Sequence, residues 1–129
     1  MKVLYDDKFF YVAVRAWDPE PEKLIRKVMR RDTSQRSDDR VLITIDTFHD
    51  KRNGYMFSTN TNSGRWEALI ENNQTVREQW DGIWFAKSRV DAEGWTAEFA
   101  FPFQSLAFDP THTVWGFNVV RSVRRLNEE

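Results

Sequence analysis

The chain of 129 residues contains no cysteine, which excludes a disulfide framework, a thiol nucleophile and a thiolate metal site. No apolar run approaches the roughly 20 residues that a bilayer-spanning helix needs. A signal peptide is not expected either, because the chain turns acidic at Asp6 and Asp7, where an apolar stretch would be required. Neither sign of charge dominates, since 19 Lys and Arg meet 20 Asp and Glu, and a net charge of −1 gives no bulk attraction to nucleic acid.

Catalytic motifs are also missing. Only 5 glycines occur, and the sequence has no glycine-rich phosphate loop, nucleophile elbow or Ser/His/Asp signature. A glycoside hydrolase needs two carboxylates flanking a cleft, and the spacing of Glu67, Glu71, Glu78 and Asp81 singles out no pair. We therefore expect a protein that is not an enzyme.

Aromatic residues, by contrast, are plentiful, with 6 tryptophans and 10 phenylalanines. Large aromatic side chains fill the cores of β-sandwiches, and they are also the surfaces on which sugar rings stack. Composition alone does not separate these two uses.

The stretch from Gly94 to Leu106 carries the strongest structural signal. Its large apolar residues alternate with smaller or polar ones, with Trp95, Ala97, Phe99 and Phe101 in the apolar positions. Period-two alternation predicts a half-buried strand, which Gly94 starts at a turn and Pro102 ends because proline donates no backbone hydrogen bond. Such a strand needs a second sheet to cover its aromatic face, so we predict an all-β fold, an antiparallel β-sandwich of two sheets.

Further strands follow from β-branched and aromatic runs between turn signals. They are expected at Val3–Tyr5, Phe9–Trp17, Val41–Phe48, Tyr55–Asn60, Arg65–Ile70, Ile83–Val90 and Val114–Arg124, with a loop at Glu71–Trp80 and a helical turn at Phe103–Phe108. Phe9–Trp17 is apolar almost throughout and is expected to be covered on both faces. Lys23–Arg31 suits a strand or a helix, and we favour a strand. Together the elements predict one domain over residues 1–129.

Four stretches, in this order, carry a family resemblance. They are Tyr5–Val14, Ser37–Val41 running into Ile45–Phe48, Gly94–Glu98 through Pro102 to Leu106, and Trp115–Arg121. The chain resembles the carbohydrate-binding module family 9-like domain, of the type found near the N-terminus of large bacterial exported proteins. This likeness implies two antiparallel sheets, sugar recognition without catalysis and often structural calcium. It also implies a parent protein that is extracellular, periplasmic or associated with the outer membrane.

Domains of this family usually carry an earlier strand ahead of the Tyr5-Asp6-Asp7 turn. We therefore expect a fragment of a larger protein that lacks its first strand region. A sheet edge without its neighbour tends to pair with another chain, so we also expect a homo-oligomer.

Two tryptophan-containing stretches are candidates for sugar binding, which needs a flat aromatic face beside planar polar groups. The first is the junction Trp80-Asp81-Gly82-Ile83-Trp84, and the second is Trp66 in a polar strand. In the alternative interpretation, one tryptophan of the junction is buried in the core and the other caps the sandwich. Trp95 and Trp115 are expected in the core, whereas Trp17 suits either place.

The last strand adds Asn118 and Arg121, because the corresponding strands of sugar-binding family members present polar side chains to the ligand. The two residues point to opposite faces, so at most one of them lies on a given binding surface. Alternatively, Arg121 pairs with a carboxylate such as Glu98.

For the implied calcium, the candidate ligands are Asp38, Asp39 and Asp46, although turn-forming aspartates explain these residues without an ion. His49 and His112 are too few and too isolated for a zinc site. Two other functions stay open. One is a structural or interaction sandwich without sugar binding, and the other is a haem-binding sandwich, for which Met56 is the one methionine in the middle of a strand.

Overall fold

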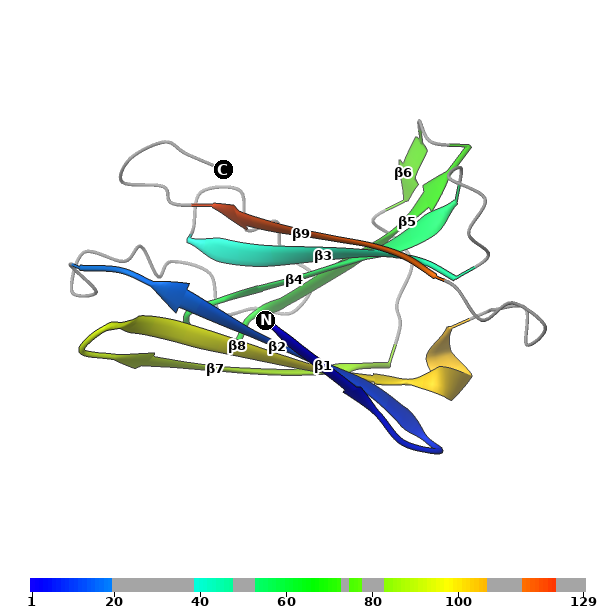
Figure 1. Ribbon diagram of the computed structural model, residues 1–129. Helices are drawn as coiled ribbons and strands as arrows, with labels where there is room; N and C mark the ends of the chain where they lie inside the picture. Colours follow the sequence, from blue (N-terminus) through cyan, green and yellow to red (C-terminus); the bar gives the residue numbers. More distant parts are fainter. Residues whose placement is uncertain (20–38, 48–52, 73–74, 78–82, 107–114, 123–129) are drawn as a thin grey trace.

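A computed structural model describes residues 1–19, 39–47, 53–72, 75–77, 83–106 and 115–122. The strands of this part of the chain form two antiparallel sheets, stacked as the two layers visible in Figure 1. In spatial order, the four-stranded sheet contains β1 (Lys2–Tyr5), β2 (Phe9–Trp17), β8 (Gly94–Pro102) and β7 (Phe85–Asp91). The five-stranded sheet contains β6 (Thr75–Arg77), β5 (Arg65–Glu71), β4 (Gly54–Asn60), β3 (Arg40–Asp46) and β9 (Gly116–Ser122). The predicted all-β sandwich is confirmed.

The core lies between the two sheets. The apolar positions of β8 are buried, as the alternation predicts: Trp95, Ala97, Phe99 and Phe101 are all at most 2% exposed. Across the interface, the rings of Phe57 and Phe101 lie 4.4 Å apart between centroids. Burial of these aromatic faces is the main favourable term in holding the sheets together.

β2 is covered on one face only. Val12, Val14 and Ala16 point into the core, whereas Tyr11 is 37% and Trp17 62% exposed on the opposite face. The expectation that both faces of this strand are covered is therefore wrong. An apolar run identifies a strand, but it does not show whether a second layer packs on each side.

Gly94, at the turn of the β7–β8 hairpin, lies where this hairpin closely approaches β2. Its φ of +143° lies in a region that side-chain-bearing residues rarely adopt, and a Cβ here would meet the Ala16 carbonyl oxygen at 2.1 Å. Beside it, the Asp18 amide donates to the Glu93 carbonyl at 2.8 Å. The predicted turn at Gly94 is thus also a place where two strands approach closely.

Several boundaries differ from those expected. β6 lies inside the stretch expected to be a loop, because Thr75–Arg77 pairs with Leu69–Glu71 across a turn in which Asn72 has a φ of +53°. The helical turn is a single short element, η2 (Phe103–Ser105). The ambiguous stretch Lys23–Arg31 lies outside the described residues. Among those residues, no helix has the length and apolar character needed to cross a bilayer.

Candidate functional site

The outward face of the four-stranded sheet presents an exposed tryptophan beside polar side chains. In one row across the strands, Trp17 of β2 lies opposite Gly94 of β8, which in turn lies opposite Asp91 of β7. Because glycine has no side chain, nothing from β8 stands between the indole and the carboxylate.

Arg15 links these groups into one cluster. Its Nη1 and Nη2 atoms donate to Oδ2 and Oδ1 of Asp91, each at 2.7 Å, and Nη1 also donates to the Thr96 hydroxyl at 3.0 Å. The Arg15 Cζ atom lies 4.6 Å from the centroid of the Trp17 ring, within the range of a cation–π contact. The guanidinium therefore holds a carboxylate and a hydroxyl in fixed positions next to an aromatic face.

The ion pair sets the charge state of this cluster. Hydrogen bonds from Arg15 lower the pKa of Asp91 to about 2, and the bond to Asp91 raises the pKa of Arg15. Both side chains are partly exposed, at 25% and 43%, so the pair contributes little to stability. Its main consequence is a rigid, internally neutralised pair at neutral pH.

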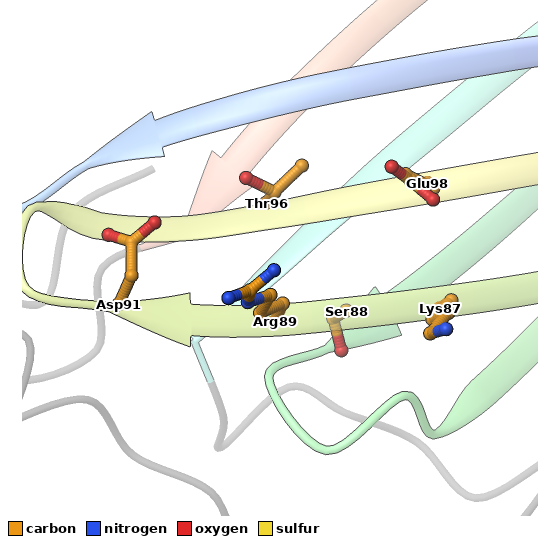
Figure 2. A pocket seen from close by; sticks show the side chains of 6 residues that line it. All are labelled: Lys87, Ser88, Arg89, Asp91, Thr96 and Glu98. Atoms are coloured by element: carbon orange, nitrogen blue, oxygen red, sulfur yellow. The ribbon is translucent and has the colours of Figure 1, made fainter.

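Next to this cluster lies an open concavity of about 420 Å³, which we call the polar hollow (Figure 2). Its lining residues are Lys87, Ser88, Arg89, Asp91, Thr96 and Glu98. Ser88 points to the other side of β7, where its hydroxyl donates to the Asn60 carbonyl at 2.7 Å. The side chains available to a ligand are therefore the charged ones and Thr96.

The other end of the same face is apolar. Leu4, Tyr11, Ala100 and Phe85 face one another in a row across β1, β2, β8 and β7, and they line a concavity of about 540 Å³, the apolar trough. The ring of Phe9 stacks on Tyr11 at 5.7 Å between centroids. Leu4 is 67% and Phe85 51% exposed, so this trough is open to solvent.

Trp84 does not lie at the surface. It is 1% exposed and contacts the rings of Phe57, Phe99 and Phe101, with centroids 5.1 to 6.0 Å away. The expectation that its ring faces a sugar is wrong, because Ile83, at 69% exposure, takes the outward position and Trp84 the inward one. The alternative that one tryptophan of this junction belongs to the core holds for Trp84. Trp80 and Asp81 lie outside the described residues.

Trp66 is likewise buried, at 6% exposure, so the expected solvent-facing ring is wrong. It lies opposite Ser58 on the face of β5 that points away from the core. Asn118 is exposed on the same face of the five-stranded sheet. The two residues stand three strand spacings apart, about 14 Å, so the structure does not bring them together.

Arg121 faces the other way, as the alternation predicts. Its Nη1 atom donates to the Trp17 carbonyl at 2.9 Å, and its Nη2 atom lies 3.7 Å from Oδ2 of Asp18. The suggested pairing with Glu98 is therefore wrong, since the carboxylate beside Arg121 is that of the buried Asp18. Arg121 ties the two sheets together at the end of β2 and so helps to position Trp17.

The proposed calcium ligands do not form one group. Asp39 precedes β3 and Asp46 ends it, so the length of a seven-residue strand, about 20 Å, separates them. Asp38, His49 and His112 lie outside the described residues. Within the described ranges, no cluster of three His, Cys, Asp or Glu side chains could hold a metal ion.

Sequence reasoning did not assign Trp17, Arg15, Asp91 or Thr96 to the site. One usable signal was present: Arg15 and Trp17 share one face of an otherwise apolar strand. The contribution of Asp91 and Thr96 depends on which strand lies beside β2, and local patterns do not show that.

The fold is a β-sandwich in which the outward face of one sheet carries an exposed tryptophan beside a fixed polar cluster. A family model described as "carbohydrate family 9 binding domain-like" matches residues 1–122, and the chain belongs to this family. Among solved structures, the chain is similar to a carbohydrate binding module family 9 from Caldicellulosiruptor kristjanssonii in complex with glucose, with a TM-score of 0.64 and 19% identity. The match covers 94% of this chain and 56% of that one, so this chain spans little more than half of its neighbour. The comparison with curated proteins found no match.

Proposed function

We propose that this domain is a non-catalytic carbohydrate-binding module and that the Trp17 end of the four-stranded sheet holds the sugar. The observation that carries the proposal is the exposed Trp17 indole next to the fixed Arg15–Asp91–Thr96 cluster. A sugar offers an apolar ring face and a rim of hydroxyls, and this arrangement has a partner for each. Membership of the family and the glucose complex of the structural neighbour support the assignment.

A binding role fits the electrostatics better than hydrolysis does. A glycosidase needs a carboxylic acid that keeps its proton near neutral pH, which requires a raised pKa. The pKa of Asp91 is lowered to about 2 instead. Asp91 is therefore suited to accept hydrogen bonds from hydroxyls and unsuited to donate a proton.

Replacing Trp17 with alanine should weaken sugar binding by about tenfold or more, because the stacking surface is lost. We expect a wild-type Kd near ~0.1 mM or weaker, since an open sheet face buries little ligand area. Calorimetry with gluco- and xylo-oligosaccharides, together with quenching of tryptophan fluorescence, measures the sugar affinity of the wild-type protein and of Trp17→Ala. Tyr5→Ala is the control, because Tyr5 is 79% exposed on another strand of the same sheet. If Trp17→Ala binds sugar as tightly as the wild-type protein, the proposed location of the sugar site on this face is wrong.

A second candidate function, docking onto protein, is favoured by the apolar trough and by β1. All four residues of β1 are exposed, including Val3 at 44% and Leu4 at 67%, and among the described strands β1 is at the edge of its sheet. An edge strand of this kind offers unpaired backbone groups to another strand.

We therefore propose that two copies of the chain associate through β1 and the adjoining trough. Light scattering after size exclusion should give about twice the 15.4 kDa chain mass at micromolar concentration. Leu4→Lys, which puts a charge on this edge, should return the mass to that of one chain. A single-chain mass for the unmodified protein at every concentration contradicts the proposal.

We also propose that the domain serves a larger exported bacterial protein, in keeping with its family. Structural calcium stays a prediction, to be tested by thermal melting with and without chelator. For haem, Met56 is only partly buried, in β4, and an absorbance spectrum of the purified protein tests that alternative.

A further inference from the structure

The polar hollow carries more positive than negative charge once the Arg15–Asp91 pair is set aside. Both oxygens of Asp91 accept from Arg15, and Oδ1 also accepts from the Glu93 amide at 2.9 Å. What is left in the hollow is Lys87 and Arg89 against Glu98. The whole chain, by contrast, has a net charge of −1.

Lys87 and Arg89 stand on the same face of β7, two residues and about 7 Å apart, and both are exposed. Within the described part of the chain, neither makes a hydrogen bond or an ion pair in the structure, although Lys87 lies opposite Glu98. Arg89 lies opposite Thr96, on the other side from Arg15. The Arg89 guanidinium therefore has hydrogen-bond donors that it does not use, and it lies on β7, the side of the hollow farthest from Trp17.

A planar guanidinium matches a carboxylate with two parallel hydrogen bonds, whereas a neutral hydroxymethyl group uses one of them at most. β2 and β7 are two strand spacings apart, about 10 Å. Arg89 lies two residues along β7 from Asp91, the residue in the row of Trp17, which adds about 7 Å along the strand. One sugar ring stacked on Trp17, together with the extended Arg89 side chain, covers this separation. A carboxylate on the ring would then meet Arg89, with Lys87 close by.

We propose that this site selects sugars that carry a carboxylate, that is, hexuronic acid units, over their neutral counterparts. This inference rests on the proposed carbohydrate-binding function of the same face. In this site, Trp17 supplies the stacking surface and Thr96 contacts the sugar through its hydroxyl. Arg89 makes the site prefer an acidic sugar.

The test compares methyl glucuronide with methyl glucoside, and methyl galacturonide with methyl galactoside, by calorimetry on the wild-type domain. Each pair differs only in a carboxylate against a hydroxymethyl group. The acidic member should bind about tenfold more tightly at low salt. Arg89→Gln should bring the ratio close to one, mainly by weakening the binding of the acidic sugar. Raising the salt from about 0.02 M to about 0.3 M should also reduce the ratio.

Lys8→Gln is the matched control, because it removes one positive charge at the far end of β2 and should keep the preference. A thermal melt confirms that Arg89→Gln is folded, as expected for an exposed position. Equal binding of the two members of each pair, or a preference that survives Arg89→Gln, overturns the inference while the carbohydrate function stands. Tighter binding of glucose 6-sulfate than of the uronide overturns the choice of a carboxylate. Failure of all these sugars to bind overturns the carbohydrate function as well.

Discussion

Replacing Trp84 with alanine is expected to destabilise the fold by roughly 3–5 kcal/mol, the range for deleting a buried aromatic side chain. Trp84 is 1% exposed and packs on rings of both sheets, Phe57 on one side and Phe99 and Phe101 on the other. Its removal leaves a cavity that the surrounding rings fill only in part. Urea unfolding followed by circular dichroism measures the change.

The control is the same chemical change at an exposed position. Trp17→Ala deletes an indole that is 62% exposed, so it should cost far less stability than Trp84→Ala. For sugar affinity we expect the opposite order of effects, because Trp17→Ala should stay folded but bind sugar more weakly. Similar destabilisation by the two substitutions would contradict the assignment of Trp84 to the core and of Trp17 to the surface.

Gly94→Ala should produce the other large effect, a loss of about 3 kcal/mol or more. Two costs combine: the φ of +143° is unfavourable for alanine, and the new Cβ would approach the Ala16 carbonyl oxygen to 2.1 Å. The Ala16 oxygen belongs to the backbone, so the pairing of β2 with β8 must shift to relieve the contact. Because Trp17 lies opposite Gly94, sugar binding should weaken too.

Gly116→Ala is the comparison for this substitution. A Cβ at Gly116 would meet the Cβ atom of Asp46 at 3.0 Å, a contact that a shift of a few tenths of an ångström relieves, and Gly116 does not have a positive φ. We expect a clearly smaller loss in thermal and urea unfolding. If Gly94→Ala is as stable as the unmodified protein, the close approach of β2 to the β7–β8 turn is wrong.

Much of the fold could be predicted from the sequence, because most of the strands have a local pattern of apolar and polar residues. Alternating aromatics in β8 show which side chains meet the second sheet, and Pro102 marks the end of that strand. The 3-residue β6 has no such pattern, since its formation depends on the neighbouring strand β5 and on the turn at Asn72.

The site was harder to predict for a related reason. Trp84 and Trp17 are the same residue type, Trp84 directly before β7 and Trp17 at the end of β2, yet one is buried and the other exposed. The difference depends on which way each strand end points relative to the second sheet.

By itself, the sequence determined that this chain forms an antiparallel sandwich, because hydrophobic periodicity is a property of neighbouring residues. It also determined that Asn118 and Arg121 point to opposite faces of their strand. Only the tertiary structure decided that Arg15, Asp91 and Thr96 meet beside Trp17, since 76 residues of sequence separate Arg15 from Asp91. Register and strand order bring such residues together, and these depend on the whole sheet having formed.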